Sequence, residues 1–435
     1  MFTHKIVIVG LFALVSANAE EHVLTIQQAL ALASRQNPDI TLARLDQQRA
    51  QQGVRIAQDP FRPKTFAGSG LAYTYGYPNP INGNAPSLFQ LNTDMALYNR
   101  PDSYRLAAAR ESARGSAFQV QNKADEVAYQ TADLFLTANQ LAHETDTLAG
   151  QLPSLQKVVD VMSAAVEGGS ELPVEVKRAK LNLAATSGKL ESAKLDLDYY
   201  ASMLAVALGY PASDRVKPID SDLPVADPGS QQTITDTALR NNRELRQMQS
   251  NVLAKELEYR SYRSARLPQV GLVAQYALFA KYNYQQYFQK FQANNFQLGA
   301  SITIPILVGS AANGSAEQAA TDLRKMRIQM EEVRNRIVTD TQRNYQQWQK
   351  AVSQRDVARM QLDVARDDLT VLLAQNQEGR APMKTLEQAR LDESQRWIEL
   401  YESEAQVTRT KLALLRQEGN LMAAIGVTPT ETSHP

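Results

Sequence analysis

The hydrophobic pattern of the chain is most regular between residues 120 and 166, where apolar or small residues recur at alternating spacings of four and three. A period of 3.5 residues is typical of an α-helix that supercoils against a partner helix. Pro101 and Asp102 open this segment, so we predict a helix over about 102–167, roughly 100 Å long at 1.5 Å per residue. The positions of this seam are Val120, Ala124, Val127, Thr131, Leu134, Ala138, Leu141, Thr145, Leu148, Leu152, Leu155, Val159, Met162 and Val166.

Pro153 lies inside this predicted helix. An interior proline removes one backbone hydrogen bond and costs about 3 kcal/mol or more. We therefore expect a kink or a helix break between Gly150 and Pro153.

A second pattern, with a period of two, predicts four β-strands at about 65–77, 89–98, 269–279 and 296–306. Strands of about 9–11 residues, apolar on one face and polar on the other, suit the wall of an outer-membrane barrel. A soluble sheet that packs one face on a core shows the same alternation. The residues predicted to face lipid are Phe89, Leu91, Met95, Leu97, Phe296, Leu298, Ile302 and Ile304.

The order of these elements occurs twice. Thr25 and Gln28 resemble a capping box that opens a helix running to about Gln58. After the strand pair and the long helix come a break, a helix over about 172–208 and a connector over 209–232. An offset of 205 superposes Ala33, Arg35, Asn37, Arg55, Pro63 and Ala72 on Ala238, Arg240, Asn242, Arg260, Pro268 and Ala277.

The repeated order of elements, with identical residues at a constant offset, indicates an internal duplication. The first repeat covers residues 20–231, and the second covers 232–427 with a long helix over about 315–378. Residues 428–435 are expected to form a flexible tail. The fold class is mainly α with a small β part, built from duplicated helix-strand-strand-helix-helix halves.

The first 19 residues read as a signal peptide, because the apolar run Ile6 to Val15 precedes the small-x-small site at residues 17–19. The later sequence has no apolar run long enough for a transmembrane helix. If the mature chain enters a membrane, it does so as strands. Four strands cannot close a barrel, and lipid does not tolerate open sheet edges, so the membrane interpretation requires several copies.

Composition narrows the range of functions. The 46 basic side chains balance 46 acidic ones, which gives no reason to expect a nucleic-acid partner. The chain has no cysteine, which excludes a lipid anchor on an N-terminal cysteine, and its four histidines are scattered. We expect no metal site, no cofactor and no enzyme activity, because no catalytic or phosphate-binding motif is present.

The loop at about 280–295 contains Tyr282, Tyr284, Tyr287, Phe288 and Phe291. Aromatic residues of this kind form an interfacial girdle or a folded external plug. The sequence leaves both alternatives open.

The two halves resemble the outer-membrane efflux, or TolC-type, family. The resemblance rests on the duplicated order and on short motifs at equivalent places. One motif is the helix-hairpin turn at 166–169, with Val176 and Ala179, and at 377–379, with Leu386 and Ala389. The others are the half-endings at 208–211 and 425–429 and the strand exit at 304–309.

The resemblance implies a homotrimer with a 12-stranded β-barrel in outer-membrane lipid and a long coiled-coil α-barrel in the periplasm. Such a duct works with a periplasmic adaptor (membrane fusion protein) and an inner-membrane pump. Its helical turns form a closed tip that docks the adaptor and opens when the inner and outer coiled coils shift. The tip residues implied here are Gly168, Gly169, Val176, Gly379, Leu386 and Glu387.

The chain departs from the family at the second turn, where members often carry aspartates that form an acidic ring. Here Thr385 and Gln388 fall at or near those places, and Glu387 is the nearest carboxylate. Glu387 is either part of such a ring or an ordinary solvated helix residue. The alternative function for the whole chain is a non-conducting coiled-coil structural or adhesin protein of the envelope.

Overall fold

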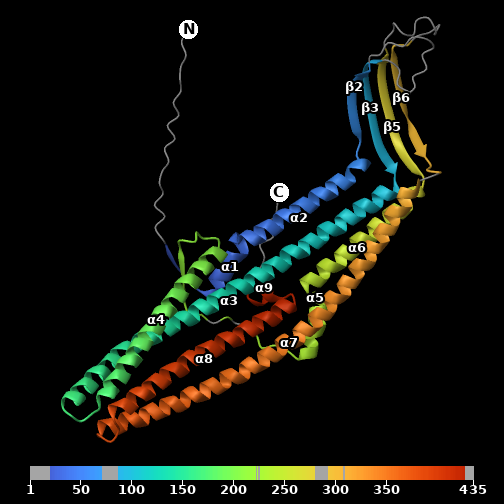
Figure 1. Cartoon of the computed structure of the whole chain (residues 1–435). Helices are drawn as coiled ribbons and strands as arrows, with labels where there is room; N and C mark the ends of the chain where they lie inside the picture. The colour runs from blue at the N-terminus through green and yellow to red at the C-terminus, as the bar shows by residue number, and fades with distance from the viewer. Residues whose placement is uncertain are drawn as a thin grey trace, which may run out of the picture. The chain divides into compact units, whose positions relative to one another are not determined.

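The computed structural model describes residues 20–70, 87–221, 223, 226–279, 292–306 and 309–426. The signal peptide, residues 71–77 of the first predicted strand, most of the aromatic loop and the tail lie outside the described residues. The chain divides into two compact units, one of residues 1–41, 123–240 and 339–435 and the other of residues 42–122 and 241–338. We call them the helical unit and the sheet unit, and Figure 1 labels their elements.

The helical unit contains both long hairpins. Its elements are β1 (Glu21–Leu24), α1 (Ile26–Gln36), the later part of α3 (Arg100–Glu167), α4 (Pro173–Ala207), β4 (Arg215–Pro218), α5 (Gln231–Asn241), the later part of α7 (Gly309–Gln377), α8 (Met383–Gln417) and α9 (Leu421–Ala424). We call α3 with α4 the first hairpin and α7 with α8 the second hairpin.

One continuous apolar core packs α1, α3, α4, α8 and α9 of this unit together. Ile26, Leu30, Leu204, Leu412 and Leu421 are each at most 1% exposed, and they come from α1, α4, α8 and α9. Val127 of the α3 seam lies in the same core, and the seam residues Ala124 and Leu134 pack against it. The 3.5-residue pattern therefore does mark a buried face.

Two short strands close the core at one side. β4 pairs in parallel with β1, from Glu21 with Arg215 to Leu24 with Pro218. The sequence predicted only a connector over 209–232, because a four-residue strand is too short to show a period. We use the name connector below for residues 209–230.

The capping box at Thr25 is confirmed, but the single helix to Gln58 is wrong. Thr25 accepts from the Gln28 N–H, and the Gln28 side chain accepts from the Thr25 N–H. The helix ends at Gln36 because Asn37, which precedes a proline, is extended. α2 (Pro38–Gln58) then starts with proline at its first position, and the Asn37 side chain accepts from the Asp39 N–H.

The second repeat has the same break. Asn242, the residue 205 positions after Asn37, caps α6 (Arg243–Arg263) by accepting from the Leu245 N–H. Each helix pair is thus interrupted at an asparagine.

Of the two alternatives expected near Pro153, a kink or a helix break, the break is wrong, since α3 is continuous from Arg100 to Glu167 with Pro153 inside it. Leu148 and Leu155, on either side of the proline, are buried. Leu148 packs with Leu190 and Ala193 of α4. This packing offsets the lost backbone hydrogen bond, which explains why the helix does not stop.

The sheet unit carries one antiparallel sheet in the order β2-β3-β5-β6. Its strands are β2 (Lys64–Gly70), β3 (Ser87–Tyr98), β5 (Gln269–Phe279) and β6 (Asn294–Thr303). Each repeat contributes one neighbouring pair, and β3 with β5 joins the two pairs. Within the described residues, β2 and β6 are the edges of the sheet.

Candidate functional site

The two hairpin turns end in the same way. Gly169 has φ +72° and Gly379 has φ +71°, in the left-handed region that favours glycine. In each case the glycine N–H and the next N–H donate back to the helix, to Val166 and Ala165 in the first turn and to Asn376 and Gln375 in the second. This is the Schellman pattern that ends a helix sharply. Gly168 is the last residue before the left-handed position of the first turn.

The apolar tip residues pack inside the hairpins. Val176 lies against a cluster of Val158, Val159, Met162 and Ala179, which joins α3 to α4. Leu386, at the corresponding place in the second hairpin, is 3% exposed. The structure therefore gives both residues a packing role within the helical unit.

An ion pair joins the two hairpins close to their turns. Lys384 Nζ of α8 lies 2.6 Å from Glu175 Oε2 of α4, and Arg178 Nη1 lies 2.6 Å from Glu175 Oε1. The hydrogen bond from Lys384 lowers the pKa of Glu175. The turns lie side by side (Figure 1). This pair could not be predicted from the sequence, since two charges 209 positions apart give no local signal.

Glu387 is 4% exposed, so it is not an ordinary solvated residue. Its Oε1 accepts from Arg390 Nη1 at 2.8 Å, one turn along α8. It lines a small cavity of 70 Å³ between the hairpins, together with Leu155, Met162 and Lys384. The charge of its carboxylate is thus paired with that of Arg390 inside the chain.

The register of the sheet places most of its large apolar side chains on one face. Residues that face each other across an antiparallel ladder lie on the same side. Thr93 of β3 pairs with Ala274 of β5, and Ala274 pairs with Leu298 of β6. One face, which we call the apolar face, thus holds Phe89, Leu91, Met95, Leu272, Tyr276, Phe296, Leu298 and Ile302.

The opposite face is mainly polar, although Phe66 of β2 and Val273 of β5 also lie on it. It carries Gln90, Asn92, Asp94, Gln275, Gln297, Ser301 and Thr303. Two of the predicted lipid-facing residues fall outside this scheme. Leu97 lies at a bulge between Ala96 and Tyr98, and Ile304 follows the end of β6.

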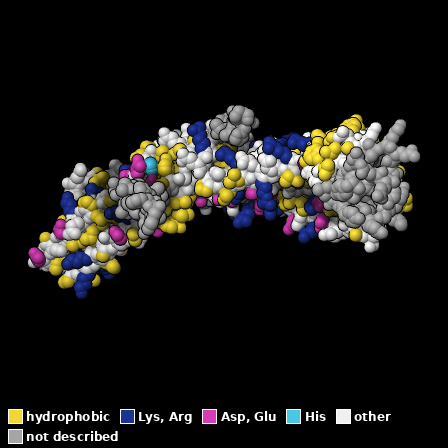
Figure 2. Space-filling view, turned by 90° about the horizontal axis from the view of Figure 1, so that it is seen from above, with side chains coloured by type: hydrophobic (Ala, Val, Ile, Leu, Met, Phe, Trp, Pro, Cys, Tyr) yellow, Lys and Arg dark blue, Asp and Glu magenta, His cyan; other side chains and the backbone are white. Residues whose placement is uncertain are grey.

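Two helices of the helical unit carry apolar stripes that remain exposed among the described residues. On α7 the stripe is Val357, Met360, Val364 and Val371, at spacings of three, four and seven. On α4 it includes Val174, Leu181 and Leu195. Exposed apolar side chains are visible in yellow in Figure 2. A coiled-coil period on an exposed face indicates a further helix as partner.

Other kinds of site find no support in the described part of the chain. No group of three or more potential ligands is placed to hold a metal ion among the residues described. None of the described helices is both long and apolar enough to cross a membrane.

Comparison with known proteins points in one direction. Residues 234–426 match the family model of the Outer membrane efflux protein. No curated protein matches the chain. Among solved structures, the chain is similar to the Campylobacter jejuni CmeC outer membrane channel, at 13% identity and a TM-score of 0.74 over 91% of this chain and 86% of that one.

It is also similar to the outer membrane protein VceC of Vibrio cholerae, at 14% identity and a TM-score of 0.72, over 91% of this chain and 96% of that one. The open state of the Neisseria gonorrhoeae MtrE channel matches at 14% identity and a TM-score of 0.62, over 94% of this chain and 91% of that one. These matches confirm the predicted fold class and the resemblance to the outer-membrane efflux family.

Proposed function

We propose that this chain, whose second repeat matches the Outer membrane efflux protein family, is a passive exit duct in the outer membrane. The observation that carries the proposal is the sheet with one apolar face, one polar face and two edges without partners in the described chain. In lipid such edges have to be paired, and a closed barrel made from several copies does so. Three copies would supply twelve strands.

A homotrimer is supported further by the stripes on α4 and α7. Burying an apolar side chain such as Leu or Val stabilises an assembly by roughly 1.5–3 kcal/mol. Leu181 is 67% exposed and Val364 is 60% exposed, so both gain if a second copy covers them. In this proposal the exposed stripes of neighbouring copies pack against one another, and the helices together form a hollow coiled-coil cylinder.

The duct is gated at the helical tip. Opening moves one hairpin relative to the other, and the Glu175–Lys384 pair resists that movement because it spans both hairpins. A periplasmic adaptor (membrane fusion protein) docks at the two glycine turns, and an inner-membrane pump supplies the energy. The burial of Glu387 and its pairing with Arg390 argue against a ring of Glu387 carboxylates around the pore.

The proposed location follows from the same reasoning. The chain is exported by residues 1–19 and anchored through its strands in outer-membrane lipid, with the hairpins in the periplasm. It has no cysteine for lipid attachment. No nucleic acid, cofactor or catalytic step enters this proposal.

Conductance in planar lipid bilayers tests the proposal. The purified protein should migrate as an SDS-resistant, heat-modifiable trimer and should form pores whose opening increases when the tip is loosened. A protein that stays non-conducting after the Glu175–Lys384 pair is removed would support the alternative, a coiled-coil structural or adhesin protein.

A further inference from the structure

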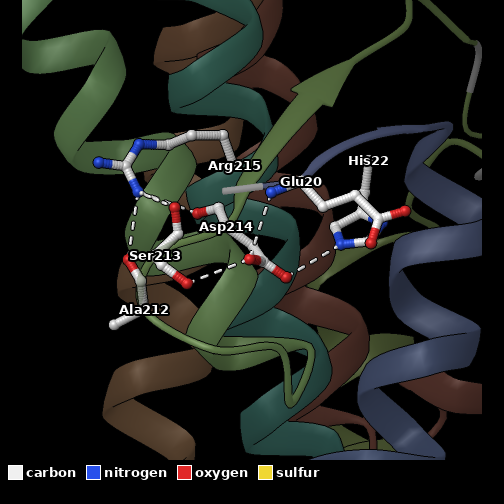
Figure 3. Close-up of polar contacts among 6 residues, drawn as sticks. All are labelled: Glu20, His22, Ala212, Ser213, Asp214 and Arg215. Carbon is white, nitrogen blue, oxygen red and sulfur yellow. Dashed lines mark hydrogen bonds and ion pairs between the residues drawn. The ribbon is translucent and has the colours of Figure 1, made fainter. Parts of the chain in front are cut away.

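The carboxylate of Asp214, in the first part of the connector, lies beside the residue at which the predicted mature chain begins. The backbone nitrogen of Glu20 donates to Asp214 Oδ1 at 3.4 Å (Figure 3). Cleavage after the small-x-small site at residues 17–19 leaves this same nitrogen as the N-terminus of the chain. A group that processing creates therefore lies next to a carboxylate.

The ladder between β1 and β4 holds Glu20 in this position. The two strands pair in parallel from Glu21 with Arg215, and the Arg215 N–H donates to the Glu20 carbonyl at 3.0 Å. The nitrogen of Glu20 is only two bonds away from that carbonyl carbon. The ladder therefore also constrains the nitrogen.

The Asp214 carboxylate is held on its other sides as well. It is 7% exposed, and its Oδ1 also accepts from Ser213 Oγ at 3.2 Å. Its Oδ2 lies 3.2 Å from Nε2 of His22, whose ring stacks on Tyr210 with centroids 4.0 Å apart and planes 12° apart (Figure 3). The carboxylate is thus fixed in the direction of Glu20.

Among the described residues, no lysine or arginine side chain forms an ion pair with Asp214. The neighbouring Arg215 directs its guanidinium to Asp198 of α4, with Nε 2.6 Å from Oδ1 and Nη2 3.0 Å from Oδ2. Its Nη1 donates instead to the backbone carbonyls of Ala212, Ser213 and Asp214 (Figure 3). A buried carboxylate is costly without a cation in contact with it, so this site is suited to receive one.

The carboxylate of Asp214 is ionised at neutral pH. The hydrogen bond from His22 is the main cause that lowers its pKa, and the bond from the Glu20 backbone acts in the same direction. Burial opposes both effects without reversing them. A cation that reaches this site therefore meets a full negative charge.

We propose that Asp214 is the docking site for the α-ammonium group that removal of the signal peptide creates at Glu20. Hydrolysis of the Ala19–Glu20 bond by a signal peptidase consumes one water and leaves a carboxylate on Ala19 and an amine on Glu20. The amine takes up a proton at neutral pH, since α-amines have a pKa of about 7.7–8.0. One neutral N–H donor is thereby replaced by a positive group with three donors.

The new group needs little movement to bind. A charge-assisted hydrogen bond is roughly twice as strong as a neutral one and measures about 2.7–2.9 Å. The nitrogen already lies 3.4 Å from Asp214 Oδ1, which is long for an ordinary hydrogen bond. The contact is therefore weak before cleavage and strong after it.

Docking at Asp214 secures the first segment of the helical unit. β1 leads directly into the capping box at Thr25 and into α1, whose Ile26 and Leu30 belong to the apolar core. An isolated two-stranded ribbon is only marginally stable, so an ion pair at its open end limits fraying of β1. The segment is thus held more firmly in the processed chain than in the precursor.

The reactivity of the N-terminal amine measures this docking directly. N-terminal sequencing of the purified mature protein should give Glu20 as the first residue. A succinimidyl ester at neutral pH acylates only an amine that is undocked and unprotonated, and mass spectrometry gives the rate relative to the exposed Lys157 of α3. Asp214→Asn should raise the N-terminal rate about tenfold, which corresponds to the loss of one hydrogen bond to a charged group.

Two further variants separate the charge from the local packing. Ser213→Ala removes a neutral hydrogen bond to the same oxygen and should change the rate far less. Insertion of one glutamate between Ala19 and Glu20 turns the Glu20 nitrogen back into a peptide N–H and moves the ammonium group outward by about 3.3 Å. The N-terminal rate of this insertion variant should equal that of Asp214→Asn, and combining the two changes should have no further effect.

The insertion also tests the effect on β1. Hydrogen–deuterium exchange of a peptide that covers Glu21–Leu24 should be about tenfold faster in the insertion variant than in the unsubstituted protein. The insertion alters no side chain of the folded chain, so it decides the question even if Asp214→Asn does not fold.

Several outcomes overturn the docking site. They are a mature N-terminus other than Glu20, equal acylation rates with and without Asp214→Asn, an equal acceleration by Ser213→Ala, or an insertion variant as protected as the unsubstituted protein. The inference rests on the proposed removal of residues 1–19 and not on the duct. The measurements need no pore, so a conducting protein with an unprotected amine contradicts the docking site alone, and a non-conducting protein with a protected amine contradicts the duct alone.

Discussion

Lys384 donates a 2.6 Å hydrogen bond to Glu175, and this contact joins α8 to α4 across 209 positions of sequence. Because it connects the two hairpins near their turns, we expect Lys384→Gln to increase pore opening. A partly exposed ion pair of this kind contributes only modestly, so the open fraction should rise by no more than roughly fivefold. Single-channel recording in planar bilayers measures this fraction.

The matched control is Arg178→Gln. Arg178 bonds the same carboxylate, but it lies one turn along α4 and does not bridge the hairpins. It should leave the open fraction nearly unchanged. Equal effects of the two substitutions would show that the charge of Glu175, rather than the bridge, controls opening.

The Glu175–Lys384 pair also predicts that strong acid increases pore opening. The hydrogen bond from Lys384 lowers the pKa of Glu175 in the folded chain below its ordinary value, about 4.3 for a free glutamate. The stabilisation is therefore complete above that ordinary value and is lost as pH falls through the lower, folded value. Pore opening should rise below about pH 4 in the unsubstituted protein. In Glu175→Gln the opening should be high already at neutral pH and should not rise further.

Two glycines of the first hairpin, Gly169 at its turn and Gly150 inside α3, should respond in opposite ways to substitution by alanine. Gly169 has a positive φ, so Gly169→Ala should destabilise the folded chain by about 1–2 kcal/mol. Gly150 lies inside α3 with no atom within 4 Å of an added methyl group, and Gly150→Ala should stabilise by about 0.5–1 kcal/mol. Thermal unfolding of the purified protein compares them. Destabilisation by both substitutions would mean that a neighbouring copy fills the space beside Gly150.

The exposed stripe of α7 predicts how copies assemble. Val364→Asp should place a carboxylate in an apolar seam between copies, which costs several kcal/mol and should abolish the SDS-resistant trimer. Thr370→Asp adds the same charge at an exposed position of α7 outside the stripe and should preserve the trimer. Migration without heating distinguishes the two. A stable trimer in Val364→Asp would place the interface elsewhere.

The periodic parts of this fold were predictable, and the parts set by single contacts were not. The long seam of α3 and the alternation of β6 repeat over many residues, so their patterns identify the elements. The break at Asn37 depends on one asparagine and the following proline, and the continuity through Pro153 depends on the burial of Leu148 and Leu155. At the tip, the two glycine turns could be found from the duplication. The burial of Glu387 and its bond to Arg390 could not, because they depend on how the hairpins pack.

The faces of the sheet give the last prediction. Leu298 lies on the apolar face and Gln297, the preceding residue of β6, lies on the polar face. If the apolar face meets lipid, Leu298→Arg should destabilise the membrane-inserted protein by about 2–4 kcal/mol, because an arginine near the bilayer midplane loses its hydration.

Gln297→Arg, on the water-facing side, should cost much less and should change pore conductance instead. Urea titration of the protein in phosphatidylcholine vesicles measures the free energy of unfolding for both. If Gln297→Arg proved the more costly substitution, the sheet would face lipid with its other side, and the assignment of the barrel interior would have to be reversed.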